Sequence, residues 1–288
     1  MAQKVEVTWY QNRQKRAVIK RVFSYIFLTI GAAIMALPFL WMVSTSLKSP
    51  GAIFTIPPEF IPREWRWDNY VRVFTDADLL LGFKNTLMII IPTTIVGLFT
   101  SSLAAFAFAK MRFPGRDMLF FALIATMMLP GIVTLVPQFI IFRDLGWLDT
   151  FKPLMIPGMF GAAMAVFFLR QFFMTIPSDL IDAAKIDGLS YFGIFLKIMA
   201  PLAKPAIVTQ GILGLLAGYN DFMGPLIYLN SPENFTLQLV LASFRGYYTS
   251  EWTLIMAGSV LALIPTLLAF FFAQKQLIEG ITMTGLKG

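Results

Sequence analysis

The sequence predicts an all-α integral membrane protein with six transmembrane helices and a short helical segment on the cytoplasmic side, between the fourth and fifth spans. Three observations predict this fold class. The 288 residues are 57% hydrophobic and 14% charged, with a mean hydropathy of +0.72, which is more apolar surface than a soluble domain of this length can bury. Several stretches are long enough to cross a hydrocarbon core about 30 Å thick, which needs roughly 20 helical residues. Finally, a polar segment at 182–188 interrupts the apolar pattern.

The predicted spans form one transmembrane domain over residues 1–288, because neither an internal repeat nor a linker is visible. They cover residues 22–47, 83–109, 118–142, 153–173, 205–229 and 252–273. The first span is longer than the 7–15-residue core of a cleaved signal peptide, so the N-terminus is expected to be retained.

The distribution of basic residues predicts the orientation. When the N-terminus is placed inside, most of the 23 Lys and Arg residues fall in cytoplasmic segments, and this bias predicts that both termini are cytoplasmic. A basic cluster beside a first span is an ordinary orientation signal, so we do not expect a nucleic-acid partner.

Proline lies near the middle of several predicted spans, where it is expected to kink the helix and free backbone carbonyls. The residues concerned are Pro38, Pro92, Pro130, Pro137, Pro225 and Pro265. These kinks serve packing, or some of them line a path that opens and closes.

Ionisable side chains are nearly absent from the predicted spans, and Asp221 is the clear exception. It follows Tyr219 and Asn220 in the fifth span, and the three residues are candidate contacts along a substrate pathway. The alternative is a carboxylate that only hydrogen-bonds a neighbouring helix. One carboxylate without a visible partner is weak support for an ion-coupled secondary carrier, which is the main alternative function.

Few side chains in this sequence are suited to catalysis. There is no His and no Cys, so the commonest general base and the thiolate metal ligands are missing. No phosphate-binding Gly-x-x-x-x-Gly-Lys-Ser/Thr run occurs either. We therefore predict that the chain is not an enzyme and that it has no catalytic residue, metal or cofactor of its own.

The inner segment 174–204 has a helical pattern of its own. Ser178 is a candidate N-cap and Gly188 can supply a left-handed stop, which predicts a helix of about nine residues between them. This helix lies on the bilayer as an interfacial element, or it contacts a soluble partner.

The side chains of this helix suit a protein contact. Small Ala183 and Ala184 allow a close approach, while Asp182, Lys185 and Asp187 offer charges to a soluble partner.

The spacing of this segment resembles the EAA loop of ABC importer permeases. That pattern is Glu-Ala-Ala, three residues, Gly, nine residues, Ile, one residue, Leu-Pro. The present chain has Asp182-Ala183-Ala184, then Gly188, Ile198 and Ala200-Pro201, with Asp182 in place of Glu and Ala200 in place of Leu.

The resemblance extends over nearly the whole chain and is greatest to the shorter, six-span permease of maltose-type carbohydrate importers. The similar segments are Pro38 to Trp41, Ser46 to Lys48, Trp67 to Tyr70, Leu169 to Phe173, Asn220 to Leu226 and Gly280 to Gly288. It implies a type I ABC importer permease fold in a bacterial cytoplasmic membrane.

The resemblance also implies roles for particular residues. Asp182, Ala183, Ala184, Asp187 and Gly188 would couple the chain to an ATPase. The tail residues that would contact the ATP-binding subunits are Thr284, Gly285, Leu286 and Lys287.

The implied partners are a second permease that completes a heterodimer, two ATP-binding subunits that carry ATP and Mg²⁺, and an extracytoplasmic solute-binding protein. The implied solute is a sugar, an oligosaccharide or a related polar molecule such as a polyol, glycerol phosphate or an acidic oligosaccharide.

Overall fold

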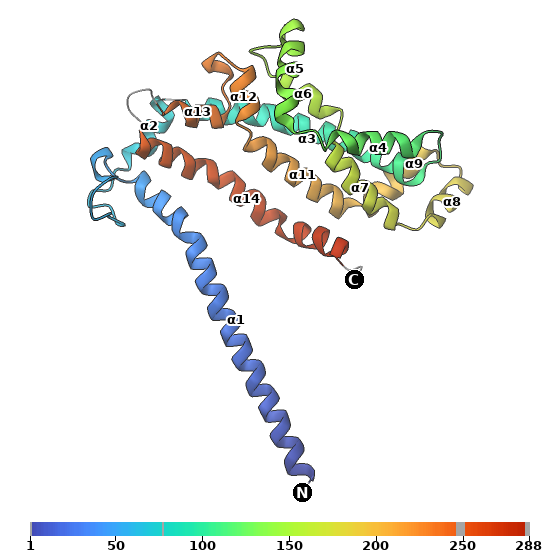
Figure 1. The fold of residues 1–288 in the computed structure, drawn as a ribbon, viewed down its shortest axis with the longest axis horizontal. Coiled ribbons are helices and arrows are strands. Elements are labelled where there is room, and N and C mark those ends of the chain that lie inside the picture. The colour runs from blue at the N-terminus through green and yellow to red at the C-terminus, as the bar shows by residue number, and fades with distance from the viewer. Residues whose placement is uncertain (1, 77, 246–250, 286–288) are drawn as a thin grey trace.

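The computed structural model describes residues 2–76, 78–245 and 251–285, with side chains described for 17–76, 78–245 and 251–275. These residues form helices and no strand, as the sequence predicts for an all-α membrane protein (Figure 1). The longer helices are α1 (Ala2–Ser46), α3 (Leu79–Lys110), α4 (Arg116–Thr126), α5 (Gly131–Asp144), α7 (Ala163–Thr175), α11 (Lys204–Tyr219) and α14 (Trp252–Gly285). The shorter ones are α2 (Asp68–Asp76), α6 (Lys152–Met159), α8 (Asp179–Ile186), α9 (Tyr191–Ile194), α10 (Ala200–Leu202), α12 (Met223–Tyr228) and α13 (Leu237–Ser243).

Four helical stretches of the described chain are long and apolar enough to cross a membrane, and there are up to six if each of two bent helix pairs is one span. The four are Ala17–Ser46, Leu79–Lys110, Lys152–Thr175 and Trp252–Lys275. The bent pairs are α4 with α5, at 96°, and Tyr191–Leu202 with α11, at 81°.

The continuous helix predicted for 118–142 is therefore interrupted. Met128 and Leu129 donate to Ala125 and Thr126, three residues back, which tightens the end of α4. Pro130 then precedes α5 with an extended ψ of 131°. Proline disfavours a helical residue before it and has no N–H for the ladder, so the helix breaks at this point.

The predicted helix over 205–229 is also two helices. α11 ends at Tyr219 and α12 begins at Met223, so Asp221 lies in a non-helical break rather than inside a span. The side chains produce the break: Asn220 Nδ2 donates to the carbonyl of Leu216, and Asp221 Oδ1 accepts from the amide of Gly224 at 3.3 Å. Asn and Asp offer such local bonds in competition with the helix.

Helix α3 runs through the length of the body, with α7 and α6 packed along it and α11 beside it (Figure 1). One buried cluster, around Phe173, Ile194 and Phe195, lies where α7 and the segment after α8 meet α3. A second, around Val73, Leu237 and Leu254, joins α2, α13 and α14. Helix α1 contacts α14 near its carboxyl end and then projects away from the body, with its apolar side chains exposed.

One amide side chain caps the carboxyl end of α1 by donating hydrogen bonds to backbone carbonyls there. Asn69, 2% exposed, donates to the carbonyls of Ser46 at 2.8 Å and Lys48 at 3.0 Å. The last carbonyls of a helix have no partner within it, and a buried one must be satisfied from elsewhere. Asn69 therefore fixes the connection between α1 and α2.

Candidate functional site

The first candidate site is the polar surface of α8 and the turn that follows it. Ser178 occupies the N-cap position as predicted, but its side chain makes no capping bond. The helix spans eight residues, and its inward face buries Ile181 and Ala184, each 3% exposed, in the cluster around Phe173. The helix is thereby attached to the body of the protein by its apolar side.

The end of α8 is a Schellman turn. The Leu189 amide donates to the Ala184 carbonyl and the Gly188 amide to the Lys185 carbonyl, both at 3.0 Å. Gly188 has a φ of +79°, the left-handed conformation that glycine adopts without strain. A side chain there would meet no atom within 4 Å, so the requirement for glycine is conformational and not steric.

The outward face of α8 carries Asp182, Ala183 and Ile186, and the exposed face continues through Asp187 and Gly188. Ile186 is 87% exposed, although isoleucine is among the most commonly buried residues. Ala184 points the other way, into the protein's own core. The sequence alone did not single out Ile186 as a surface residue. The pattern that could have identified it is an apolar residue one helical turn after the exposed Asp182.

The segment after α8 connects it to the membrane-spanning part. α9 continues into a π-helical stretch, Phe195–Met199, and α10, before the bend into α11. Phe195 and Met199 are buried in the same cluster as Ala184. A displacement of α8 would therefore be transmitted to α11 through packed side chains and not through a free loop.

The predicted tail contacts fall at the end of the chain. Thr284 and Gly285 belong to the last turn of α14, while Leu286 and Lys287 lie outside the described residues.

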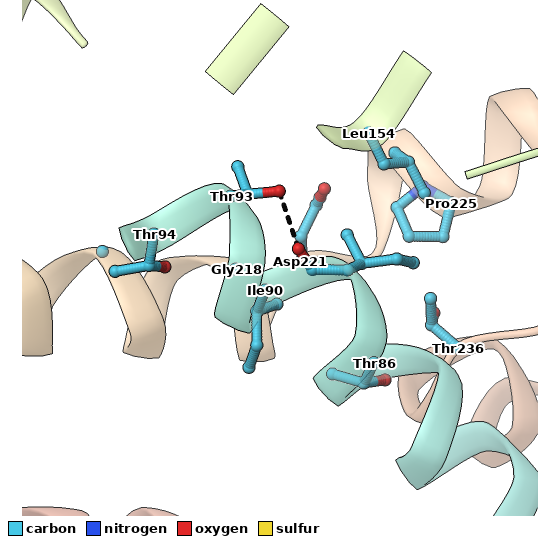
Figure 2. Close-up of a pocket in the computed structure, with 11 residues that line it drawn as sticks. Thr86, Ile90, Thr93, Thr94, Leu154, Gly218, Asp221, Pro225 and Thr236 are labelled. Carbon is cyan, nitrogen blue, oxygen red and sulfur yellow. Dashed lines mark hydrogen bonds between the residues drawn. The ribbon is translucent and has the colours of Figure 1, made fainter. Parts of the chain in front are cut away.

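The second candidate site is an open pocket of about 440 Å³ at the break between α11 and α12 (Figure 2). Asp221 enters it from the break, Thr86, Thr93 and Thr94 from α3, and Thr236 from the residue before α13. Threonine side chains and one carboxylate therefore line the same small space.

The pocket includes only one of the three residues predicted for the substrate pathway. Tyr219 is buried, and its hydroxyl donates to the carbonyl of Ala262 at 2.8 Å, which ties α11 to α14. Asn220 uses its side-chain amide to cap α11. Neither lines the pocket that contains Asp221.

An aspartate on the α5–α6 loop holds the segment that follows α12. The carboxylate of Asp149 accepts from the hydroxyl of Ser231 and, at 2.9 Å, from the amides of Asn230 and Ser231. Asn234 donates to the same carboxylate at 3.2 Å. The Ser231 hydroxyl first, and then these amides, hold the pKa of Asp149 well below its usual value.

The same segment is held from α3. Asn85, 4% exposed, donates to the carbonyls of Glu233 and Phe235, at 2.8 and 3.0 Å. The Leu237 amide donates to the Thr86 hydroxyl at 2.9 Å. These bonds fix the residues on both sides of Thr236, so they set the outer wall of the pocket.

The described residues contain no group of three or more His, Asp or Glu side chains placed to hold a metal ion. The structure therefore offers a pocket with polar side chains and, on α8, an exposed face with charged residues.

Comparisons with known proteins give a consistent picture. Residues 97–282 match the family described as binding-protein-dependent transport system inner membrane component. The arabinooligosaccharides transport system permease protein AraQ of Bacillus subtilis is 33% identical over 94% of this chain and 97% of that protein. The lactose transport system permease protein LacG of Rhizobium radiobacter is 31% identical, over 90% and 94%.

A solved structure shows the same fold. A chain of a bacterial ABC transporter involved in the import of the acidic polysaccharide alginate matches with a TM-score of 0.79 and 25% identity. The match covers 89% of this chain and 96% of that one.

Replacing Asp149 with Asn should lower the thermal unfolding midpoint of the purified protein at pH 7. A carboxylate whose pKa is lower in the folded state stabilises the fold above its ordinary pKa, about 3.9, and this contribution is lost as the pH falls below that value. The difference between wild type and Asp149→Asn should therefore shrink on acidification. Asp144→Asn, an exposed control, should behave like wild type throughout. Equal midpoints for Asp149→Asn and wild type at pH 7 contradict the structural role.

Proposed function

The chain belongs to the family of binding-protein-dependent transport system inner membrane components, and from this membership we propose how it couples ATP hydrolysis to solute movement. It is a permease subunit of an ATP-driven importer and does not itself hydrolyse ATP. The observation that carries the coupling proposal is α8, whose apolar face is buried in the permease while its opposite face is exposed.

The exposed face of α8 is the docking site for an ATP-binding subunit. Asp182, Ala183, Asp187 and Gly188 form the contact surface, and Ile186 is its apolar anchor. An exposed large apolar side chain with a polar rim is typical of a protein interface. Ala184 acts indirectly, because its small side chain lets α8 lie close to the core.

Membership of the family supports the following set of remaining partners. A second permease completes the pathway, two ATP-binding subunits hold ATP and Mg²⁺, and an extracytoplasmic binding protein delivers the solute. The tail from Thr284 to Lys287 contacts the ATP-binding subunits. The distribution of basic residues supports a cytoplasmic location for both termini in a bacterial cell.

The solute is a sugar, an oligosaccharide or a related polar molecule. This proposal draws on the relatives, whose names refer to arabinooligosaccharides, to lactose and to sulfoquinovosyl glycerol. Asp221 is the proposed pathway contact on this chain, and Tyr219 and Asn220 support it by fixing the end of α11.

The function is tested with the full complex in proteoliposomes. The chain, its partner permease, the ATP-binding subunits and the binding protein should import α-1,5-arabinotriose or lactose when ATP is supplied. Import should persist when a protonophore and a sodium ionophore collapse the ion gradients. Uptake that needs no ATP-binding subunit and disappears with the gradient would instead identify a secondary carrier.

Replacing Gly188 with Val should disrupt coupling, whereas Gly188→Asn should preserve it. A β-branched residue at φ +79° is strained by about 1–3 kcal/mol, while asparagine tolerates this region. The turn can relieve the strain by moving α8, so the affinity for the ATP-binding subunits should fall on the order of 5- to 100-fold. Co-purification and solute-stimulated ATP hydrolysis measure this effect. If Gly188→Val co-purifies with the ATP-binding subunits and supports ATP hydrolysis like wild type, the turn at Gly188 is not needed for coupling.

A further inference from the structure

Thr236 has a buried hydroxyl that the fold does not use. The residue is 4% exposed, and its Oγ1 finds no hydrogen-bond partner among the described residues. It occupies the N-cap position of α13, yet its side chain does not cap that helix. Buried hydroxyls are nearly always hydrogen-bonded. Among the described residues, Thr45 and Thr253 also have buried hydroxyls without a partner, but only Thr236 lines this pocket, where a bound solute can supply the partner.

The neighbouring Thr86 shows the contrast. Its hydroxyl donates to Gly82 O at 2.8 Å and accepts from the Leu237 amide at 2.9 Å, so it serves the structure. Thr236, which directly precedes α13, points toward Pro225 and lines the same pocket (Figure 2).

Asp221 offers the complementary group. Its Oδ1 accepts the Gly224 amide at 3.3 Å, and no bond from the described residues is made to Oδ2. Thr93 donates its hydroxyl proton to Ile89 O at 2.6 Å and keeps its oxygen lone pairs. The pocket therefore combines a carboxylate acceptor with hydroxyls that can accept, and in Thr236 also donate.

The pocket continues along α11. A second open pocket, of about 520 Å³, shares Thr93, Thr94 and Gly214 with the first and extends to Gln210. Gln210, Gly214 and Gly218 are spaced four residues apart, so they lie on one face of α11. The two pockets form one groove between α3 and α11, which we call the hydroxyl groove.

Charge narrows the class of solute. The described residues that line the hydroxyl groove include one carboxylate, Asp221, and neither Lys nor Arg. An anionic sugar would be repelled by this carboxylate, because no basic side chain in the groove compensates its charge. A neutral sugar hydroxyl can donate to the carboxylate in a charge-assisted bond.

We propose that the hydroxyl groove is a solute-binding subsite of this subunit, in which a hydroxyl of a neutral sugar bridges Asp221 and Thr236. This inference rests on the proposed function and adds a site and a charge class to it. Thr93 and Thr94 contact the next hydroxyls, and Gly214 keeps the groove open toward Gln210.

The test compares two variants, each of which lacks one buried hydroxyl. Thr236→Val and Thr253→Val each delete a buried hydroxyl without a partner, but Thr253 lies in α14 outside the groove. In proteoliposomes containing the full complex, Thr236→Val should raise the KM for α-1,5-arabinotriose about 3- to 10-fold, the loss of one hydrogen bond. Thr253→Val should stay near wild type, and Thr236→Ser, which keeps the hydroxyl, should raise the KM less than Thr236→Val does. An unchanged KM for Thr236→Val, or equal effects of the two Val variants, overturns the subsite.

A second measurement does not depend on transport. The chain has no cysteine, so Thr94→Cys and Ile95→Cys carry single thiols on adjacent faces of α3. Ile95, 64% exposed, does not line the groove. In the complex, a water-soluble methanethiosulfonate should modify Thr94→Cys faster, and α-1,5-arabinotriose should slow that reaction while an alginate trisaccharide should not. Equal rates for the two thiols overturn the inference, as does protection by the acidic sugar.

The two proposals fail in different ways. If the wild-type complex imports no sugar with ATP, the proposed function and this subsite both fail. If it imports arabinotriose while Thr236→Val keeps its KM, the subsite alone fails.

Discussion

The structure depends on the satisfaction of backbone hydrogen bonds wherever the chain leaves a helix in or near lipid. No water is available in the hydrocarbon core, so a broken helix persists only where side chains, packed protein or a polar cavity supply partners. Asn69 serves the end of α1, Asn85 and Asp149 serve the segment after α12, and Asn220 caps α11. Each of these three interruptions is thus paired with a specific polar side chain, whereas the break between α4 and α5 depends on Pro130.

This constraint links the two candidate sites. α11 begins after the π-helical stretch and ends at the break that contains Asp221. Its near end is packed through Phe195 and Met199 to the buried face of α8, and its far end is anchored by Tyr219 to α14. A movement imposed on α8 by a partner would reach the hydroxyl groove along one rigid helix. The proposed coupling surface and the proposed pathway are therefore connected to opposite ends of α11.

Hydropathy and residue spacing could predict the fold class, the short helix between the fourth and fifth spans and the left-handed stop at Gly188. Each of these depends on local sequence: apolar length, helical periodicity and one backbone conformation. The breaks in the third and fifth spans could not be predicted in the same way. Pro130 ends a helix, but Pro38, Pro92 and Pro265 lie inside continuous ones, so proline alone does not decide.

Long-range contacts also limited what the sequence could show about the sites. Asp221 was identifiable as a rare charge in an apolar span, but Thr236 reaches the same pocket from a different element, and nothing local sets it apart from other threonines. Asp149 holds residues 81 to 85 positions away. The exposure of Ile186 depends on which face of α8 packs inward, and the local sequence does not show which face that is.

The central claim is that α8 transmits the action of an ATP-binding subunit. The most direct measurement is cross-linking from Ile186→Cys, a single thiol in a chain that has no other. A short photoactivatable maleimide at this position should attach the chain to the ATP-binding subunit in the assembled complex, and ATP should change the yield. A complex that transports at the wild-type rate but gives no such cross-link, with or without ATP, would contradict the account.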